Sequence, residues 1–98
     1  MPIVDKFSLS WLKWQGMALL VLGRREAALE RFAAMHALDP HNVYALASMA
    51  QIESQLGRPA RAIELQQALT RQAPDQAHAW FNLGFMLEEA GRLAEAEV

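Results

Sequence analysis

The sequence predicts an all-α protein, an α-solenoid of antiparallel helix pairs, and three observations support this fold class. A pattern of residues recurs every 34 positions, the segments between its turn residues consist of strong helix formers, and they contain no β-branched run. Apolar residues make up 53 % of the 98 residues, which is enough for the core of one domain.

The repeat is visible in several independent columns of the sequence. A Gly-Arg pair begins at Gly23, Gly57 and Gly91, and Pro40 and Pro74 have the same spacing. Three further columns agree: Leu12, Leu46 and Trp80; Gly16, Ala50 and Gly84; and Ala28, Ala62 and Ala96. A unit of two short helices cannot bury its own apolar face, so successive units must stack on one another.

The turn residues divide the chain into five helices, over about 9–22, 25–38, 43–56, 59–72 and 77–90, and a short stub from about 92. Each Gly-Arg glycine is expected to end a first helix, because glycine tolerates the left-handed conformation found there. Pro59 suits the first turn of the next helix, where a missing N–H costs nothing. Asn42 and Asp75 are placed to cap the helices that follow them.

These columns resemble the tetratricopeptide repeat family over residues 9–98, and "AWFNLGFMLEEAGRLAEAE" is close to the family consensus. The resemblance implies a right-handed solenoid with repeat 1 at 9–42, repeat 2 at 43–76 and an incomplete repeat 3 at 77–98. Residues 1–8 would form an N-terminal segment before the repeats.

Three residues depart from the family pattern, because Gln15, Glu53 and Gln66 are polar where its members are usually apolar. Each is expected to be a partly solvated seam or a local weak point, and Ile52 is expected to supply the volume missing beside Glu53. The Gly16 and Ala28 columns are expected where paired helices approach closely. Overpacking there costs roughly 1–3 kcal/mol, so Gly84→Leu and Ala62→Phe are predicted to unfold the protein more readily than a surface change.

Charged turn residues are interpreted as facing solvent. Arg24, Arg58 and Arg92 recur in the turns, and we expect them to pair with nearby carboxylates such as Glu26. The alternative is a row of arginines that binds a partner.

The residue content argues against several function classes. Nine basic and eleven acidic side chains give a net charge of −2, whereas nucleic-acid binders usually carry a dense basic face. There is no cysteine, and none of the three histidines, His36, His41 and His78, forms a ligand pair at helical spacing. No nucleophile triad and no glycine-rich phosphate loop is present, so neither an enzyme nor a metal or cofactor site is predicted.

The sequence also lacks the features of a membrane or secreted protein. Its longest apolar run, 17–22, is too short to span a bilayer, and the N-terminus does not resemble a signal peptide. A cytoplasmic location is the default expectation.

The resemblance implies that the first helix of each pair lines a concave surface. The large or polar residues expected there are Lys13, Trp14, Met17, Tyr44, Gln51, His78, Phe81, Asn82 and Phe85; smaller or flanking positions include Leu20, Ala47, Ser48, Ser54, Gln55, Glu88 and Glu89. Many of the first group are aromatic or sulfur-containing, and an exposed apolar stripe of that size usually marks an interface. We therefore expect a partner protein or peptide to bind in this groove, with Lys13, Gln51 and Asn82 fixing its orientation.

One binding mode of the family is not expected. Some members bind a C-terminal carboxylate through lysine, asparagine and arginine side chains, and Lys13 matches the first of these positions. The remaining carboxylate-binding positions do not match, because they are occupied by Met17, Ser48, His78 and Asn82. The groove instead suits an apolar or amphipathic peptide.

Three alternatives remain open at this point. The N-terminal segment, with Ile3, Val4 and Phe7, would fold over the groove. A second copy would cover the first helix, which is apolar nearly all round, or the open third repeat, and so form a homodimer. In the third alternative, the chain is the non-catalytic repeat region of a larger enzyme.

The last residues, "GFMLEEAGRLAEAEV", predict an uncovered helix face. The stub over 93–98 spans only about 9 Å, too little to cover Leu83 and Leu87. Leaving each leucine exposed forgoes roughly 1.5–3 kcal/mol. We expect both to be exposed in a monomer, and the ending to reflect a longer natural chain, a second copy, or a frayed stub, of which the first is favoured.

Overall fold

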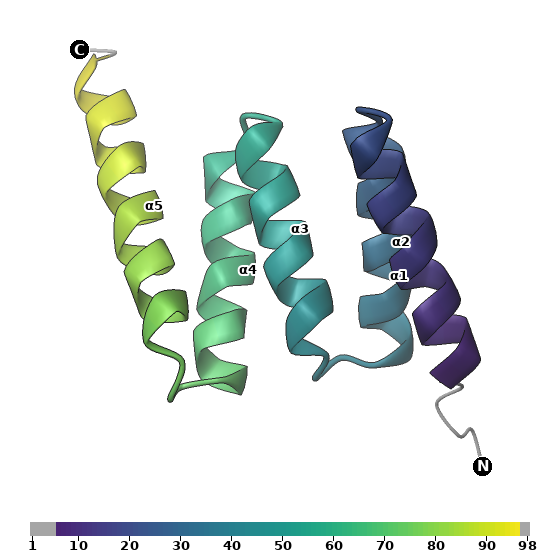
Figure 1. Cartoon of the computed structure of the whole chain (residues 1–98). Coiled ribbons are helices and arrows are strands. Elements are labelled where there is room, and N and C mark those ends of the chain that lie inside the picture. The colour runs from purple at the N-terminus through teal and green to yellow at the C-terminus, as the bar shows by residue number, and fades with distance from the viewer. Residues whose placement is uncertain (1–5, 97–98) are drawn as a thin grey trace.

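The computed structural model, which describes the backbone of residues 6–96 and the side chains of 7–92, shows helices packed side by side (Figure 1). They are α1 (Lys6–Val21), α2 (Arg25–Leu38), α3 (Val43–Gln55), α4 (Pro59–Gln72) and α5 (Ala77–Ala96). Within the described residues, the backbones of two helices approach closely only where the helices are neighbours along the chain. The predicted α-solenoid is therefore confirmed.

The turns within the first two pairs form as their glycines predict. Gly23 and Gly57 have positive φ angles of 77° and 76°, a region that other residues rarely adopt. Asn42 caps α3, because its side-chain oxygen accepts a 2.9 Å hydrogen bond from the backbone N–H of Ala45. The cap predicted at Asp75 is wrong, since α5 begins at Ala77 and the capping position falls on the next residue along.

The core lies between paired helices, where the small residues of the repeat allow close approach. Phe32 of α2 is fully buried, and a Cβ added to Gly16 of α1 would lie 2.6 Å from its Cζ atom. Ala28 and Ala50 are 0 % exposed and Ala62 is 1 % exposed. Close packing at these columns is confirmed for the first two helix pairs.

The polar departures from the family pattern have specific partners. Glu53 is buried and accepts a 2.9 Å hydrogen bond from Nη1 of Arg58, while Ile52 beside it fills the core. Gln66 is buried as well, and its Nε2 donates to the carbonyl oxygen of Ala79 at 2.9 Å. Glu53 and Gln66 are therefore not solvated seams, because each bonds to a residue outside its own helix. Gln15, the third departure, is only half-buried.

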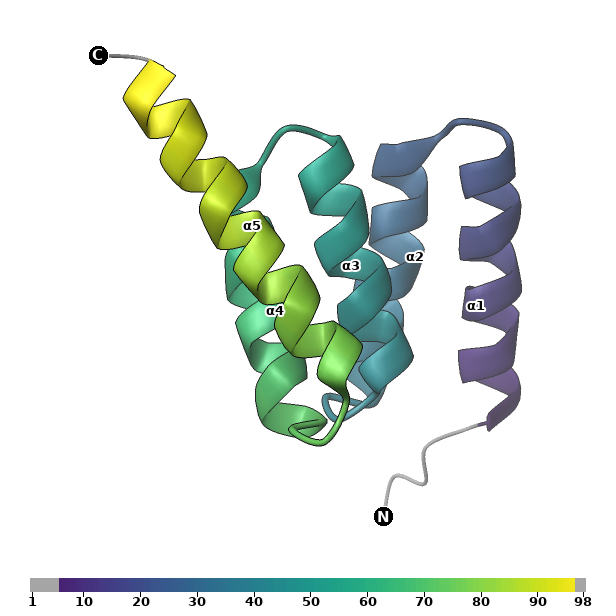
Figure 2. The same ribbon diagram turned by 60° about the vertical axis from the view of Figure 1, so that its left-hand side comes forward.

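The expected turn at Gly91 and the separate stub after it do not form. α5 continues through this residue to Ala96 (Figure 2). A glycine permits a turn but does not impose one, and here helical hydrogen bonds continue instead. Arg92 adds ion pairs across one helical turn, to Glu88 at 2.6 Å and Glu89 at 3.1 Å, which favour the helix.

The prediction about the uncovered leucines is half wrong. Leu83 is only 9 % exposed, since its side of α5 packs on α4, whereas Leu87 is 48 % exposed. The prediction that Gly84→Leu unfolds the protein is also wrong, because it assumed that a paired helix lies close to Gly84. No atom lies within 4 Å of a Cβ built on Gly84, so a larger side chain meets no neighbour there.

The N-terminal boundary differs from the expected one. α1 begins at Lys6, so the segment predicted at 1–8 overlaps its first residues. Phe7 belongs to this helix and is 86 % exposed, which gives no sign of a cover over the groove. Ile3 and Val4 lie outside the described residues. No described helix combines the length and hydropathy needed to cross a membrane.

Candidate functional site

The first helices of the successive pairs are α1, α3 and α5. In Figure 2, α3 stands between the other two, with α2 and α4 behind. All nine residues expected to line the concave face belong to these three helices. The second helices α2 and α4 place Phe32 and Leu65 in the core behind that face.

Four of the nine residues share one hollow between α3 and α5. Tyr44 and Gln51 come from α3, His78 and Asn82 come from α5, and the hollow has a volume of about 340 Å³. Further polar groups in its wall come from Ser48, Gln55 and Gln66, and its apolar residues are Leu20, Ala47, Ile52 and Leu69. The hollow therefore combines amide, imidazole and hydroxyl groups with an apolar surface.

Lys13 connects α1 to this hollow through an aromatic ring. Its Nζ lies 4.5 Å from the centroid of the Tyr44 ring, within the range of a cation–π interaction. The Tyr44 ring also packs on Phe32, with centroids 5.8 Å apart and planes tilted by 59°. Tyr44 is thus held by the core on one side and carries a positive charge at its outer face.

The remaining expected residues lie outside this hollow. Trp14 and Met17 of α1 are 62 % and 37 % exposed, and Phe81 and Phe85 of α5 are 75 % and 57 % exposed. Because α1 and α5 do not pack on one another within the described residues, the two groups are separate. The residues on α1 and those on α5 belong to one surface only because the residues of α3 lie between them.

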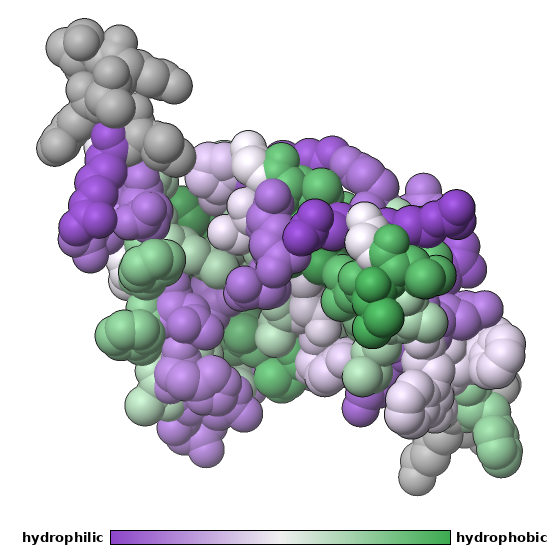
Figure 3. All heavy atoms as spheres, turned by 45° about the horizontal axis from the view of Figure 1, so that its top comes forward, coloured by the Kyte–Doolittle hydropathy of each residue, from purple (hydrophilic) through white to green (hydrophobic). Residues whose placement is uncertain are grey.

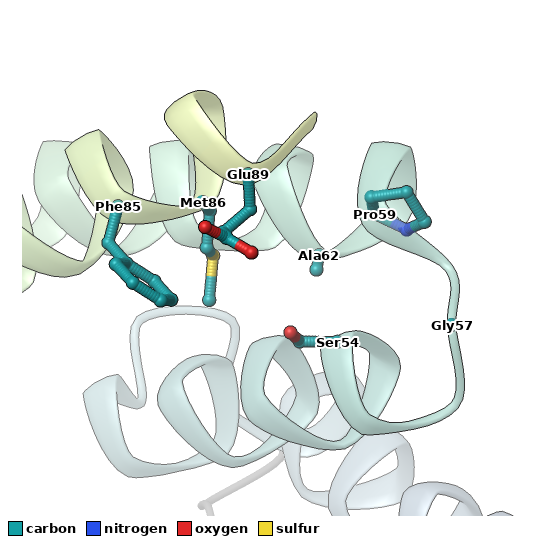
Figure 4. A pocket seen from close by; sticks show the side chains of 7 residues that line it. All are labelled: Ser54, Gly57, Pro59, Ala62, Phe85, Met86 and Glu89. Carbon is teal, nitrogen blue, oxygen red and sulfur yellow. The ribbon is translucent and has the colours of Figure 1, made fainter. Parts of the chain in front are cut away.

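A second hollow, of about 250 Å³, lies where α5 meets the turn between α3 and α4. Phe85, Met86 and Glu89 reach it from α5, opposite Ser54 and Ala62 (Figure 4). Four of its wall residues were not expected on a site: Gly57, Pro59, Ala62 and Met86. The sequence indicated these four residues in one respect only: the turn between α3 and α4 joins two helices that the repeat pattern predicted.

A network of ion pairs holds the same turn in place. Arg58 donates to Glu53 and to Glu26, so that it links α2, α3 and the start of α4. The hydrogen bond with Glu53, and then that with Glu26, raise the pKa of Arg58 above its usual value, so it stays protonated. Pairing with carboxylates is therefore confirmed for Arg58, in its turn, and for Arg92, although Arg92 lies within α5 and not in the expected turn.

A further contact orients the rim of the first hollow. Nε of Arg25 donates to Oε1 of Gln55 at 3.0 Å, which ties a residue in the wall of the hollow to the start of α2. Among the described residues, no group of three or more His, Cys, Asp and Glu side chains is arranged to hold a metal ion.

Comparison with known proteins agrees with this architecture. A family model described as a tetratricopeptide repeat matches residues 19–80, from the end of α1 to the start of α5. No curated protein matches the sequence. The matched region covers more than half of the chain and contains the whole of α2, α3 and α4, so the chain belongs to the tetratricopeptide repeat family.

Proposed function

We propose that the chain is a non-catalytic interaction module that binds a peptide of a partner protein on its concave face. Repeats of this family generally mediate protein–protein interaction. The observation that carries the proposal is the hollow between α3 and α5, whose wall combines polar and apolar side chains.

The chemistry of the hollow suits the backbone of an extended or helical peptide. Gln51 and Asn82 each carry both donors and acceptors, so they can pair with peptide N–H and C=O groups. The exposed rings of Phe81 and Phe85 would hold apolar side chains of the same peptide. Lys13, placed over Tyr44, would orient an acidic group at the α1 end.

A selection from a random peptide library displayed on phage tests this function. The selected peptide, labelled with fluorescein, is titrated with the chain and followed by fluorescence anisotropy. We expect Gln51→Ala and Asn82→Ala to weaken binding at least about tenfold, a loss near 1.4 kcal/mol. Gln67→Ala is the matched control, because Gln67 is exposed on α4, outside the hollow. Equal affinity of all three variants would remove the proposal.

The exposed aromatic residues give a second test of the same surface. The double variant Phe81→Ala/Phe85→Ala should stay folded, since both rings are more than half exposed. We expect it to bind the selected peptide at least about tenfold more weakly. An unchanged affinity, with an unchanged circular dichroism spectrum, would show that the rings do not contact the peptide.

Self-association is the second candidate, and the distribution of exposed hydrophobic residues favours it. Many of them lie along α1 and along α5, the first and last helices of the array, and Figure 3 shows hydrophobic side chains exposed at both of its ends. Val21 and Leu22 are 87 % and 72 % exposed, and Trp11 is 65 % exposed. Sedimentation velocity decides this candidate: a mass that rises with concentration supports it, and a monomer at every concentration contradicts it.

A further inference from the structure

The two junctions between successive helix pairs differ at one pair of repeat positions. At the first junction, Arg25 begins α2, and its Nε donates a hydrogen bond to Oε1 of Gln55 on α3 at 3.0 Å. Thirty-four residues later the same positions hold Pro59, which begins α4, and Glu89 of α5. The short ring of proline carries no donor, so it cannot bond across the second junction as Arg25 does across the first.

The second hollow, of about 250 Å³, lies at this place, because both Pro59 and Glu89 line it. Phe85 and Met86 add apolar walls from α5. Figure 4 shows the side chains of Glu89 and Met86 pointing from α5 toward Ser54. The second hollow therefore combines apolar walls with one carboxylate.

The charges beside the second hollow favour a basic ligand. Among the described residues, the ion pair of Glu89 is with Arg92 of its own helix, at 3.1 Å, and the same arginine pairs with Glu88 at 2.6 Å. Two carboxylates and one guanidinium leave one negative charge. Arg92 contacts only Oε1 of Glu89, and a carboxylate has about four acceptor sites, so a second cation can bond to it.

A further helix packed behind α5 would not fill the second hollow. α4 follows α3 in this way, and Gln51 and Gln55 of α3 remain exposed beside it. Phe85 and Glu89 hold the same repeat positions on α5. Both also belong to the positions expected on the concave face, so the second hollow is open to a ligand that lies along that face.

From these observations we propose that the second hollow binds an arginine side chain of the partner peptide. Its guanidinium bonds to the carboxylate of Glu89, as Arg25 bonds to Gln55 at the first junction, and its aliphatic part packs on Phe85 and Met86. Arginine suits the hollow better than lysine, because its planar group donates two hydrogen bonds to one carboxylate and stacks on an aromatic ring. The inference rests on the function proposed for the concave face and specifies one side chain of the ligand.

The first test uses N-acetylarginine amide, a probe that does not depend on the sequence of the peptide. The chain is labelled with carbon-13 at its methionine methyl groups, of which Met86 lies in the second hollow and Met49 in the core. We expect the Met86 signal to shift saturably, with half-saturation below about 10 mM, while the Met49 signal stays unchanged. N-acetylcitrulline amide, which has a similar shape without the charge, should bind at least about tenfold more weakly. A Met86 signal that the arginine probe does not shift, or that both probes shift alike, would overturn the proposal.

Two substitutions at Pro59 locate the bound arginine. Pro59→Arg places in the second hollow the side chain that Arg25 supplies at the first junction, so it should bond to Glu89 and abolish binding of the probe. Pro59→Ala is the matched control and should bind as the unaltered chain does. Circular dichroism checks that both variants are folded. Equal binding by the two variants would contradict the assignment.

Two neighbouring carboxylates provide a second matched pair of variants. Glu89→Gln removes the charge from the second hollow and should weaken binding of the probe at least about tenfold. Glu88→Gln removes the same charge one residue away, from a residue that also pairs with Arg92 but lines a different hollow, and should change the affinity less than about threefold. Equal losses would show that only the overall charge of α5 matters, which would overturn the proposal.

The peptide selected by phage display separates this inference from the proposed function. We expect an arginine to recur at one position of the selected peptides, and its replacement by citrulline to weaken binding at least about tenfold. Peptides that bind the hollow between α3 and α5 and keep their affinity without arginine would overturn this inference and leave the proposed function standing. A library that yields no binding peptide would contradict the proposed function, and the Met86 titration alone would then decide whether the second hollow binds arginine.

Discussion

Replacing either of two equivalent glycines by alanine should have opposite effects on stability. Gly16 and Gly84 belong to the same repeat column and both lie inside helices, α1 and α5. Their surroundings differ, because Gly16 packs on Phe32 and Gly84 faces open space. The pair therefore isolates the contribution of close packing between the two helices of a repeat.

The expected magnitudes follow from the distances at each glycine. A Cβ at Gly16 would lie 2.6, 2.8 and 3.0 Å from three ring atoms of Phe32, and overpacking of this kind costs about 1–3 kcal/mol. Phe32 cannot withdraw easily, since it is fully buried with Tyr44 packed on its ring. Alanine inside a helix gains about 0.5–1 kcal/mol over glycine at both sites. Gly84→Ala should therefore stabilise the chain by that amount, and Gly16→Ala should be about 1–3 kcal/mol less stable than Gly84→Ala.

Urea unfolding followed by far-UV circular dichroism measures both free energies of unfolding. Helix propensity cancels in the difference between the two variants, so the difference reports the contact with Phe32 alone. In thermal unfolding, the melting temperatures should differ by at least about 4 °C. Equal stabilities, or a more stable Gly16→Ala variant, would refute the close approach of α1 and α2 at this point.

Three further predictions concern stability and use the same unfolding assay. Asn42→Ala removes the cap of α3 and should cost about 1 kcal/mol, whereas an unchanged stability would deny the capping hydrogen bond. Gln66→Leu removes the hydrogen bond that joins α4 to the carbonyl oxygen of Ala79, which then keeps only its helical donor, and should cost about 1 kcal/mol; a stabilised variant would contradict this. Leu46→Ala, at 1 % exposure, should cost about 2–5 kcal/mol, and Leu87→Ala, at 48 % exposure, less than half as much. Similar losses for the two leucines would mean that the side of α5 bearing Leu87 is covered in solution.

The helix boundaries were predictable because they depend on local chemistry. Glycine at Gly23 and Gly57, proline at Pro59 and asparagine at Asn42 act through their own backbone or the next turn. The helix that continues through Gly91 was not predictable in this way, because a turn there would need a second helix to pack on α5. The residues near Gly91 do not indicate whether such a helix packs on α5.

The candidate site was predictable only in part, for a related reason. Column positions alone bring Tyr44, Gln51, His78 and Asn82 to the concave side, and they do share a hollow. Whether residues of α1 and α5 meet across α3 depends on how the helix pairs are rotated on one another. That rotation comes from packing throughout the core, so the distance between Trp14 and the α5 residues could not be inferred from their spacing.

The most direct test of the proposed function is a map of where a selected peptide binds. Nitrogen-15 correlation spectra of the labelled chain of 98 residues, recorded with increasing peptide, report the shift of each backbone amide. We predict that the largest shifts fall on the hollow between α3 and α5, at Tyr44, Ser48, Gln51, His78 and Asn82. Shifts concentrated on the exposed sides of α2 and α4, with those five amides unchanged, would contradict the assignment of the concave face as the binding surface.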